Sequence, residues 1–453
     1  MQKIQIVDFM AIKSADIAIK KTVLLIGEQA SGKSTIAKLV YFFKSLRDDF
    51  IYFISENLEM VQSPAILQEN FWAEISRKFY RFFGAIQHLP PFKIQYWYSD
   101  TKFIILEQAQ RDDGRKKLKI HFSQDLFTQA IHDTKPLISR LKTVSGKRDI
   151  IESSIYRSSL EELNKHISKL FGDDRQPVFI PAGRNMAVTY ADFFKQNFYG
   201  SLSSDLAFMQ DEDTLKPRFV RDTYIMIQFL QRVQIMIDTF KGASFESMLA
   251  SAVHERPDLK KLQDEKILDK IAMILKGKYK HDGNLGEIIM FAEKDYVFLI
   301  NASSGQQEVI RVLQDIFLNI FNNANVFRVI EEPEAHLFPM SQKYLLEVIA
   351  FMIAQTNSQI ILTSHSPYIL SVVNNLLFAS TIPEKSANFK SDFYLKPQET
   401  EVYSITNGQS ASIIDRQTGL VDQNALDTIS EELADEFEQM YDLSFKNGEK
   451  ESL

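Results

Sequence analysis

The run GEQASGKST, residues 27–35, constrains this chain more than any other stretch of its sequence. It fits the pattern G-x-x-x-x-G-K-[ST], in which a glycine-rich loop wraps a chain of phosphates. The apolar run TVLLI precedes it, and the amphipathic run IAKLVYFFKSL follows it. A strand, a tight loop and a helix in that order predict an α/β sheet with the loop at the carboxyl end of the strand. A glycine turn that merely contains Lys-Ser is the alternative, which the flanking strand and helix disfavour.

The parts of this loop have separate predicted roles. Gly27 and Gly32 let the backbone approach the phosphates, Lys33 reaches the β- and γ-phosphates, and the Ser34 hydroxyl binds Mg²⁺. ATP and Mg²⁺ are therefore the expected cofactors. The residues predicted to contact the nucleotide in this loop are Gly27, Glu28, Gln29, Ala30, Ser31, Gly32, Lys33, Ser34 and Thr35.

A pair of carboxylates follows another strand-like run. In NVFRVIEEPEAHLFP, residues 325–339, the apolar run ends in Glu331 and Glu332. At the carboxyl end of a buried strand, one carboxylate can bind Mg²⁺ while the other polarises the attacking water. A solvated acidic turn is the alternative. His365 ends the next apolar run, in SQIILTSHSPYIL, where it could contact the γ-phosphate.

The start of a predicted amphipathic helix, SSGQQ at residues 303–307, raises a further possibility. Helix N-termini carry unpaired N–H groups and a partial positive charge, so small residues there suit an anion. Ser303, Ser304, Gly305 and Gln306 are therefore candidate nucleotide contacts. A plain Ser/Gly turn that caps the helix remains the alternative.

Composition excludes several classes of protein. The 453 residues include 45% hydrophobic residues, carry a formal charge of −7 and contain no cysteine. The chain as a whole is therefore not a polycation that attracts nucleic acid, and it has neither disulfides nor thiolate metal sites. Its N-terminal run lacks a signal-peptide core, and polar residues interrupt its most apolar helices. We expect a cytoplasmic protein without membrane contact.

In their order, these motifs resemble an ABC-type ATPase head. The long segment after the phosphate loop is similar to the SMC class, and EEPEAHLFP with TSHSP resembles the overcoming-lysogenization-defect (OLD) ATPases. The resemblance implies an α/β P-loop fold: a mixed sheet with an antiparallel side sheet and a helical insertion. It also implies that residues 27–35 are Walker A, 303–307 the signature and 333–337 the D-loop. Glu331 would bind the metal, Glu332 would be the general base and His365 the switch histidine.

Some positions depart from that pattern. Gln29 stands where these heads commonly carry Asn, Glu331 replaces the usual Asp, and the signature lacks the leading Leu and second Gly of transporters. The Q-loop is assigned to the strand-to-loop passage at residues 177–184. In PVFIPAGR, residues 177–184, a strand runs into a loop that OLD-like proteins carry near the nucleotide, so Arg184 is a candidate phosphate contact. A surface charge after a buried strand is the alternative.

The expected organisation has four parts. They are residues 1–125, an N-terminal lobe with Walker A; 126–280, a mainly helical insertion with a return strand near 177–184; 281–390, a lobe with the signature, Walker B and switch histidine; and 391–453, closing strands and an acidic C-terminal helix.

The resemblance also implies partners. OLD nucleases carry a Toprim domain that needs D-x-D, and residues 366–453 contain no such triplet. Stand-alone OLD-like ATPases of the Septu and PARIS anti-phage systems work with a separately encoded nuclease. We therefore expect slow, regulatory ATP hydrolysis, a homodimer or higher homo-oligomer through ATP-sandwiched heads, a nuclease effector, and a phage-derived trigger or DNA. The alternative is an SMC/RecF-like head that clamps DNA in repair or recombination; a nuclease acting alone is a third.

Overall fold

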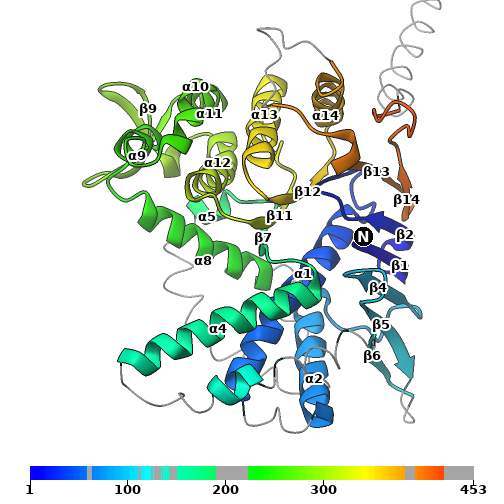
Figure 1. Ribbon diagram of the computed structural model, residues 1–453. Coiled ribbons are helices and arrows are strands. Elements are labelled where there is room, and N and C mark those ends of the chain that lie inside the picture. The colour runs from blue at the N-terminus through cyan, green and yellow to red at the C-terminus, as the bar shows by residue number, and fades with distance from the viewer. Residues whose placement is uncertain are drawn as a thin grey trace, which may run out of the picture.

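A computed structural model describes most of the chain. The described residues are 1–58, 64–110, 114–123, 126, 134, 136–141, 150–189, 223–382 and 393–422. They form one large sheet of eleven strands, a small sheet of three strands, and helices on both faces of the large sheet (Figure 1). No helix in this described part is long and apolar enough to cross a membrane.

Five parallel strands form the half of the large sheet that carries the predicted motifs. Their order is β13-β3-β12-β11-β7. Neighbouring parallel strands end at the same edge of a sheet, so the loops that follow β3, β12, β11 and β7 lie beside one another. The bounds are β3 Thr22–Ile26, β7 Gln176–Ile180, β11 Val326–Glu331, β12 Gln359–Ser364 and β13 Thr400–Thr406.

The other half of the sheet confirms the predicted antiparallel side. Its order is β6-β5-β4-β1-β2-β14, and strand β14 joins β2 to the rest of the sheet through β13. The apolar residues of β1 and β4 alternate with polar ones, as expected where one face is buried. The bounds are β1 Lys3–Phe9, β2 Ile12–Ala18, β4 Lys93–Trp97, β5 Phe103–Gln110, β6 Lys116–Phe122 and β14 Gln409–Ser412.

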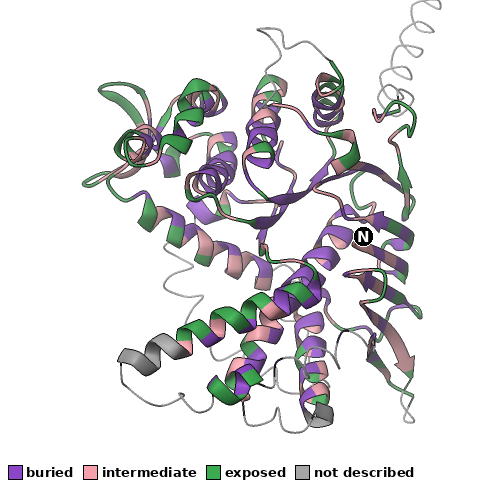
Figure 2. Ribbon diagram, viewed as in Figure 1, coloured by how far each residue is buried: buried purple, intermediate pink, exposed green. Residues whose placement is uncertain are grey.

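The large sheet separates two hydrophobic cores. Along β3, Val23 and Leu25 belong to the core that contains α1, α2 and α4, and Leu24 belongs to the core that contains α8 to α14. Buried residues lie along the strands of the sheet and along the helices of both layers (Figure 2). The first core is rich in aromatic contacts, such as Phe42 with Phe79 and Phe82. The bounds are α1 Lys33–Glu56, α2 Pro64–Phe83, α4 Ile150–Phe171, α8 Thr223–Thr239, α12 Ser304–Asn322, α13 Pro339–Gln355 and α14 Pro367–Ala379.

The predicted insertion, residues 126–280, contains helices. A small sheet that the sequence did not predict begins at its end and lies mostly in the next part, residues 281–390. Strands β10-β9-β8 pair as antiparallel neighbours beside α9 to α11. The remaining bounds are α5 Met186–Thr189, α9 Phe245–Ala252, α10 Lys260–Asp264, α11 Ile267–Leu275, β8 Lys278–Asp282, β9 Gly286–Ala292, β10 Asp295–Phe298, and the 3-10 turns η3 Pro257–Leu259, η4 Leu299–Asn301 and η5 Pro397–Glu399. The four-part division stays a prediction, and the acidic C-terminal helix lies outside the described residues.

Candidate nucleotide site

The predicted phosphate loop connects β3 to α1, as its sequence requires. Gly27 and Gly32 both have positive φ angles, of 151° and 108°. A side chain at Gly27 would collide with the Ile405 carbonyl of β13, and one at Gly32 would collide with Ile12 of β2. The loop therefore needs glycine for its backbone conformation and also for close contact with strands from both ends of the chain.

Lys33 lies inside the loop rather than in solvent. Its Nζ donates to the carbonyls of Gly27 at 2.8 Å and Glu28 at 2.7 Å. Burial lowers the pKa of Lys33, and the nearby carboxylates of Glu332 and Glu334 partly offset that effect. The ammonium group is thus already held where the loop would surround a phosphate.

His365 links this lysine to the carboxylate pair. Its Nδ1 lies 3.3 Å from Lys33 Nζ, and its Nε2 lies 3.3 Å from Glu332 Oε1. A lysine ammonium only donates hydrogen bonds, so Nδ1 accepts and the ring proton of a neutral His365 is assigned to Nε2, facing Glu332. Lys33, His365 and Glu332 therefore form a continuous polar chain between the phosphate loop and the predicted general base.

The carboxylate pair lies where the sequence predicted it, at the end of β11. Glu331 is buried, and its Oε2 accepts from the Ala182 amide at 3.3 Å. Glu332 is partly exposed and has a φ of 44°, while its amide donates to the Thr363 carbonyl at 2.9 Å. Left-handed backbone is uncommon for a residue other than glycine and is concentrated at functional sites. The two neighbours consequently face different surroundings.

Glu334 is a site residue that the sequence analysis did not single out. Its Oε1 accepts from the Ser364 hydroxyl at 2.6 Å and from the His365 amide at 2.9 Å. It thus joins the loop after β11 to the loop after β12. The third carboxylate in E-E-P-E was the available signal, but only the fold shows that it faces the neighbouring strand.

Arg184 follows β7 and is fully buried, so it is not the surface charge of the alternative interpretation. Its guanidinium donates to the carbonyls of Glu331 at 2.5 Å and Glu332 at 3.0 Å, and also to Pro181. Its Nε contacts Glu308 of α12. In this arrangement Arg184 supports the backbone of the carboxylate pair, and direct contact with phosphate stays a prediction.

The predicted signature begins α12, and its first residues form a helix cap. Ser303 Oγ accepts from the Gln306 amide, and the Ser303 amide donates to Gln306 Oε1 at 3.0 Å. Gln306 also donates to the Leu275 carbonyl at 2.7 Å. Ser303 and Ser304 are nevertheless exposed. The capping interpretation is therefore right about local geometry, and it leaves the helix start accessible.

Gly305 brings the signature against the predicted D-loop. A side chain at this position would lie 2.6 Å from the His336 carbonyl. His336 itself has a φ of 59°. The signature and the loop after β11 therefore touch backbone to backbone, so a shift in one requires a shift in the other.

A row of buried polar residues anchors the rest of α12. Arg311 pairs with Glu287 of β9, and Asp315 pairs with both Arg232 of α8 and Arg328 of β11. Burial alone would raise the pKa of Asp315, but the two guanidinium groups together hold it below its usual range. The helix that carries the signature is thus fixed to the insertion, the small sheet and the Walker B strand.

The loop and its neighbours fit ATP and Mg²⁺. The amides of Gln29, Ala30 and Gly32 donate to no acceptor among the described residues, which leaves them for phosphate oxygens. Ser34, in the first turn of α1, and Glu331 would hold the ion, which neutralises charge on the phosphates when bound. Within the described residues, no group of three or more His, Asp or Glu could by itself hold a metal.

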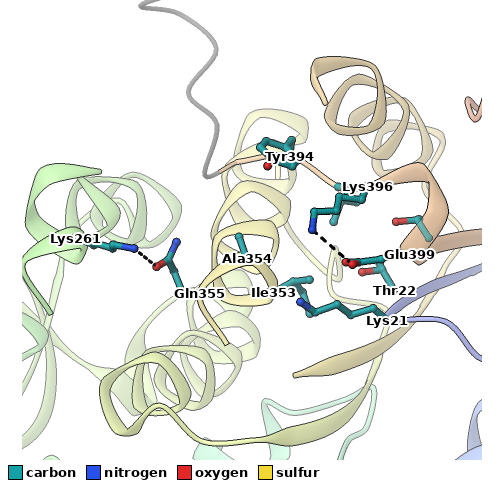
Figure 3. A pocket seen from close by; sticks show the side chains of 11 residues that line it. Lys21, Thr22, Lys261, Ile353, Ala354, Gln355, Tyr394, Lys396 and Glu399 are labelled. Atoms are coloured by element: carbon teal, nitrogen blue, oxygen red, sulfur yellow. Dashed lines mark hydrogen bonds and ion pairs between the residues drawn. The ribbon is translucent and has the colours of Figure 1, made fainter. Parts of the chain in front are cut away.

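A separate cavity of about 260 Å³ lies at the opposite edge of the sheet (Figure 3). It includes Thr22, at the first residue of β3, whereas the phosphate loop follows the last. Lys261 donates to Gln355 across it, and Lys396 pairs with Glu399. This cavity does not belong to the candidate nucleotide site.

A phosphate loop, a carboxylate pair and a histidine at the ends of adjacent parallel strands define a P-loop ATPase. The family model of the AAA ATPase domain, AAA_15, matches residues 1–370. The chain belongs to that family, and it is an ATP-hydrolysing enzyme. No curated protein matches it.

The comparison with solved structures finds SMC heads and a recombination mediator protein. An Smc head with an extended coiled coil, from Pyrococcus furiosus, is 14% identical with a TM-score of 0.35, covering 95% of this chain and 99% of that one. The SMC head of Thermotoga maritima is 10% identical with a TM-score of 0.34, covering 91% and 97%. The recombination mediator RecF is 13% identical with a TM-score of 0.27, covering 91% and 97%.

Proposed function

We propose that this ATPase acts as a switch in which two copies engage head to head around ATP. The observation that supports this proposal most strongly is the exposed start of α12. Among the described residues, no hydrogen bond of Ser303, Ser304, Gly305, Gln306 or Gln307 reaches the phosphate loop of the same chain. The exposed start of α12 therefore suits a γ-phosphate held by a second copy, which makes dimerisation depend on that phosphate.

Exposed apolar side chains support this proposal. Phe338, at the start of α13, is 75% exposed, and Tyr368, at the start of α14, is 54% exposed. The two helix starts are neighbours, because Ser366 donates to Gln342, and they follow the loops after β11 and β12 that carry Glu332 and His365. Large exposed apolar groups beside a functional loop favour contact with another protein surface. Other exposed apolar residues lie on segments next to Arg184, the signature or Phe338: Met186, Phe298, Ile300 and Met340.

The resemblance to stand-alone OLD-like ATPases suggests a biological role for this switch. In that role, the ATP-bound dimer is a sensor and scaffold that holds or releases a separately encoded nuclease in anti-phage defence. Loss of the γ-phosphate on hydrolysis would separate the heads and change the surface offered to the nuclease. A phage-derived molecule or DNA would be the trigger.

A second candidate is a head that clamps DNA directly. Strand β6 is at the edge of the large sheet, and its Lys117 and Lys119 are exposed. A DNA clamp requires affinity that falls with salt and with removal of these charges. Measuring duplex DNA binding by anisotropy for wild type and for K117E/K119E separates the two roles, because the switch without DNA contact shows neither dependence.

The dimer itself is tested with a hydrolysis-deficient variant. Glu332→Gln should bind ATP without cleaving it, so it should sediment as a dimer with ATP and as a monomer without nucleotide. Lys33→Ala should sediment alike under both conditions. Sedimentation of Glu332→Gln that does not change with ATP would contradict the proposal.

A further inference from the structure

The third carboxylate of the E-E-P-E run has contacts that the roles above do not explain. Glu334 lies in the turn after β11, and its Oε1 receives two donors from the neighbouring strand end, the Ser364 hydroxyl and the His365 amide. Ser364 Oγ in turn accepts from the Ser366 amide at 2.9 Å. One carboxylate oxygen thus fixes the backbone just where β12 ends.

That backbone determines where the His365 ring lies. Both ring nitrogens are engaged at 3.3 Å, one with Lys33 and the other with Glu332. His365 is itself exposed, so packing alone does not hold its ring. The amide that Glu334 binds belongs to the same residue, and a displaced backbone would displace the ring from both partners.

The other oxygen of Glu334 is also informative. Oε2 is buried and makes no hydrogen bond with any described residue. A buried carboxylate oxygen without a partner among the described residues costs free energy.

We infer that Glu334 is a positioning residue for ATP hydrolysis, which holds the backbone of His365 so that the imidazole stays between Lys33 and Glu332. It acts through the histidine and does not touch the reacting atoms. The inference rests on the proposed role of His365 at the γ-phosphate.

The test compares three substitutions. Glu334→Ala removes both contacts and should lower kcat about 100-fold, the scale of an effect from a displacement of about 1 Å in a catalytic group. Its Kd for ATP should change little, since the phosphate loop is intact. Glu334→Gln keeps an oxygen that accepts both donors and should restore kcat to within a few-fold of wild type. Ser364→Ala removes one donor and should fall between them.

A matched control comes from α13. Glu347 is another partly buried carboxylate, paired with Lys270 and Lys343 away from the site. Glu347→Ala should lower Tm at least as much as Glu334→Ala while leaving kcat unchanged. Equal losses of kcat in the two variants would show that lost stability, rather than lost positioning, is responsible, and would overturn the inference.

His365→Ala separates this inference from the one it rests on. If His365→Ala hydrolyses ATP like wild type, the role of the histidine fails and the inference fails with it. If His365→Ala is inactive but Glu334→Ala keeps its kcat within a few-fold of wild type, only the positioning role of Glu334 is wrong. A loss in Glu334→Gln as large as in Glu334→Ala would also overturn it.

Discussion

The phosphate loop and the start of the signature helix differ in how far contacts within the same chain enclose them. The loop is enclosed: Gly27 touches β13, Gly32 touches β2, and Lys33 donates to loop carbonyls. The signature start is capped at Ser303 but remains exposed at its surface. In the proposed dimer, folding of one chain therefore builds the first half of a nucleotide site and presents the second half to the other copy.

The largest effect is expected at Lys33. Lys33→Ala removes the charge that reaches the β- and γ-phosphates, so a binding titration of this variant should detect no bound ATP. Lys294→Ala, an exposed lysine in the β9–β10 turn, is the matched control and should bind like wild type. If Lys33→Ala binds ATP as tightly as wild type, residues 27–35 are not the phosphate-binding loop.

Glu332→Gln should affect a different step. The amide keeps the shape of the carboxylate but cannot accept a proton, so kcat should fall about 10²- to 10⁴-fold while ATP still binds. Single-turnover hydrolysis and nucleotide binding, measured on one preparation, check the two statements separately. Turnover within a few-fold of wild type would mean that Glu332 is not the general base.

The same substitution, glycine to alanine, can be made in the phosphate loop and in the signature, and its effects on ATP binding and turnover can be compared. Gly27→Ala forces a β-carbon against the Ile405 carbonyl and should weaken ATP binding. Gly305→Ala forces one against the His336 carbonyl and should leave ATP binding by the phosphate loop intact while lowering turnover. We expect about 1–3 kcal/mol of strain in each case. Equal loss of ATP affinity in both variants would contradict the separation.

The sequence predicted the parts of the site that are local. Residues 27–35, the pair Glu331 and Glu332, and His365 each follow an apolar strand, and strand ends are recognisable from neighbouring residues alone. The antiparallel side sheet was predictable for the same reason, since alternation along a strand is a local pattern.

The remainder depends on contacts between distant segments. The sequence does not show that β13 lies beside β3, that Gly305 touches His336, or that Glu334 faces β12. The predicted apolar face of α12 is present, but Arg311 and Asp315 are buried as well. Their partners come from β9, α8 and β11, so only the assembled fold reveals them.

The smallest effect on turnover, and a pH-dependent effect on stability, is expected at Asp315. Two guanidinium groups outweigh the effect of burial, so the pKa of Asp315 in the folded protein is lower than in the unfolded chain. The pKa of an Asp in an unfolded chain is about 3.9. The stabilisation is therefore complete above about pH 4 and is lost as the pH falls through the lower folded pKa. Asp315→Asn should lose about 3–5 kcal/mol of unfolding free energy at pH 7. Urea unfolding should show that this difference shrinks on acidification; a constant difference would contradict it.

The central claim is that the two half-sites meet in trans, and mixing two inactive variants tests it most directly. Ser304→Arg obstructs the signature and leaves the phosphate loop, whereas Lys33→Ala does the reverse. Each alone should be inactive. In an equal mixture, half of the dimers hold one complete site, so ATP turnover should return to roughly a quarter of wild type if each site works alone. Ser304→Arg that associates and hydrolyses ATP like wild type would contradict the trans arrangement, and SSGQQ would then be a helix cap only.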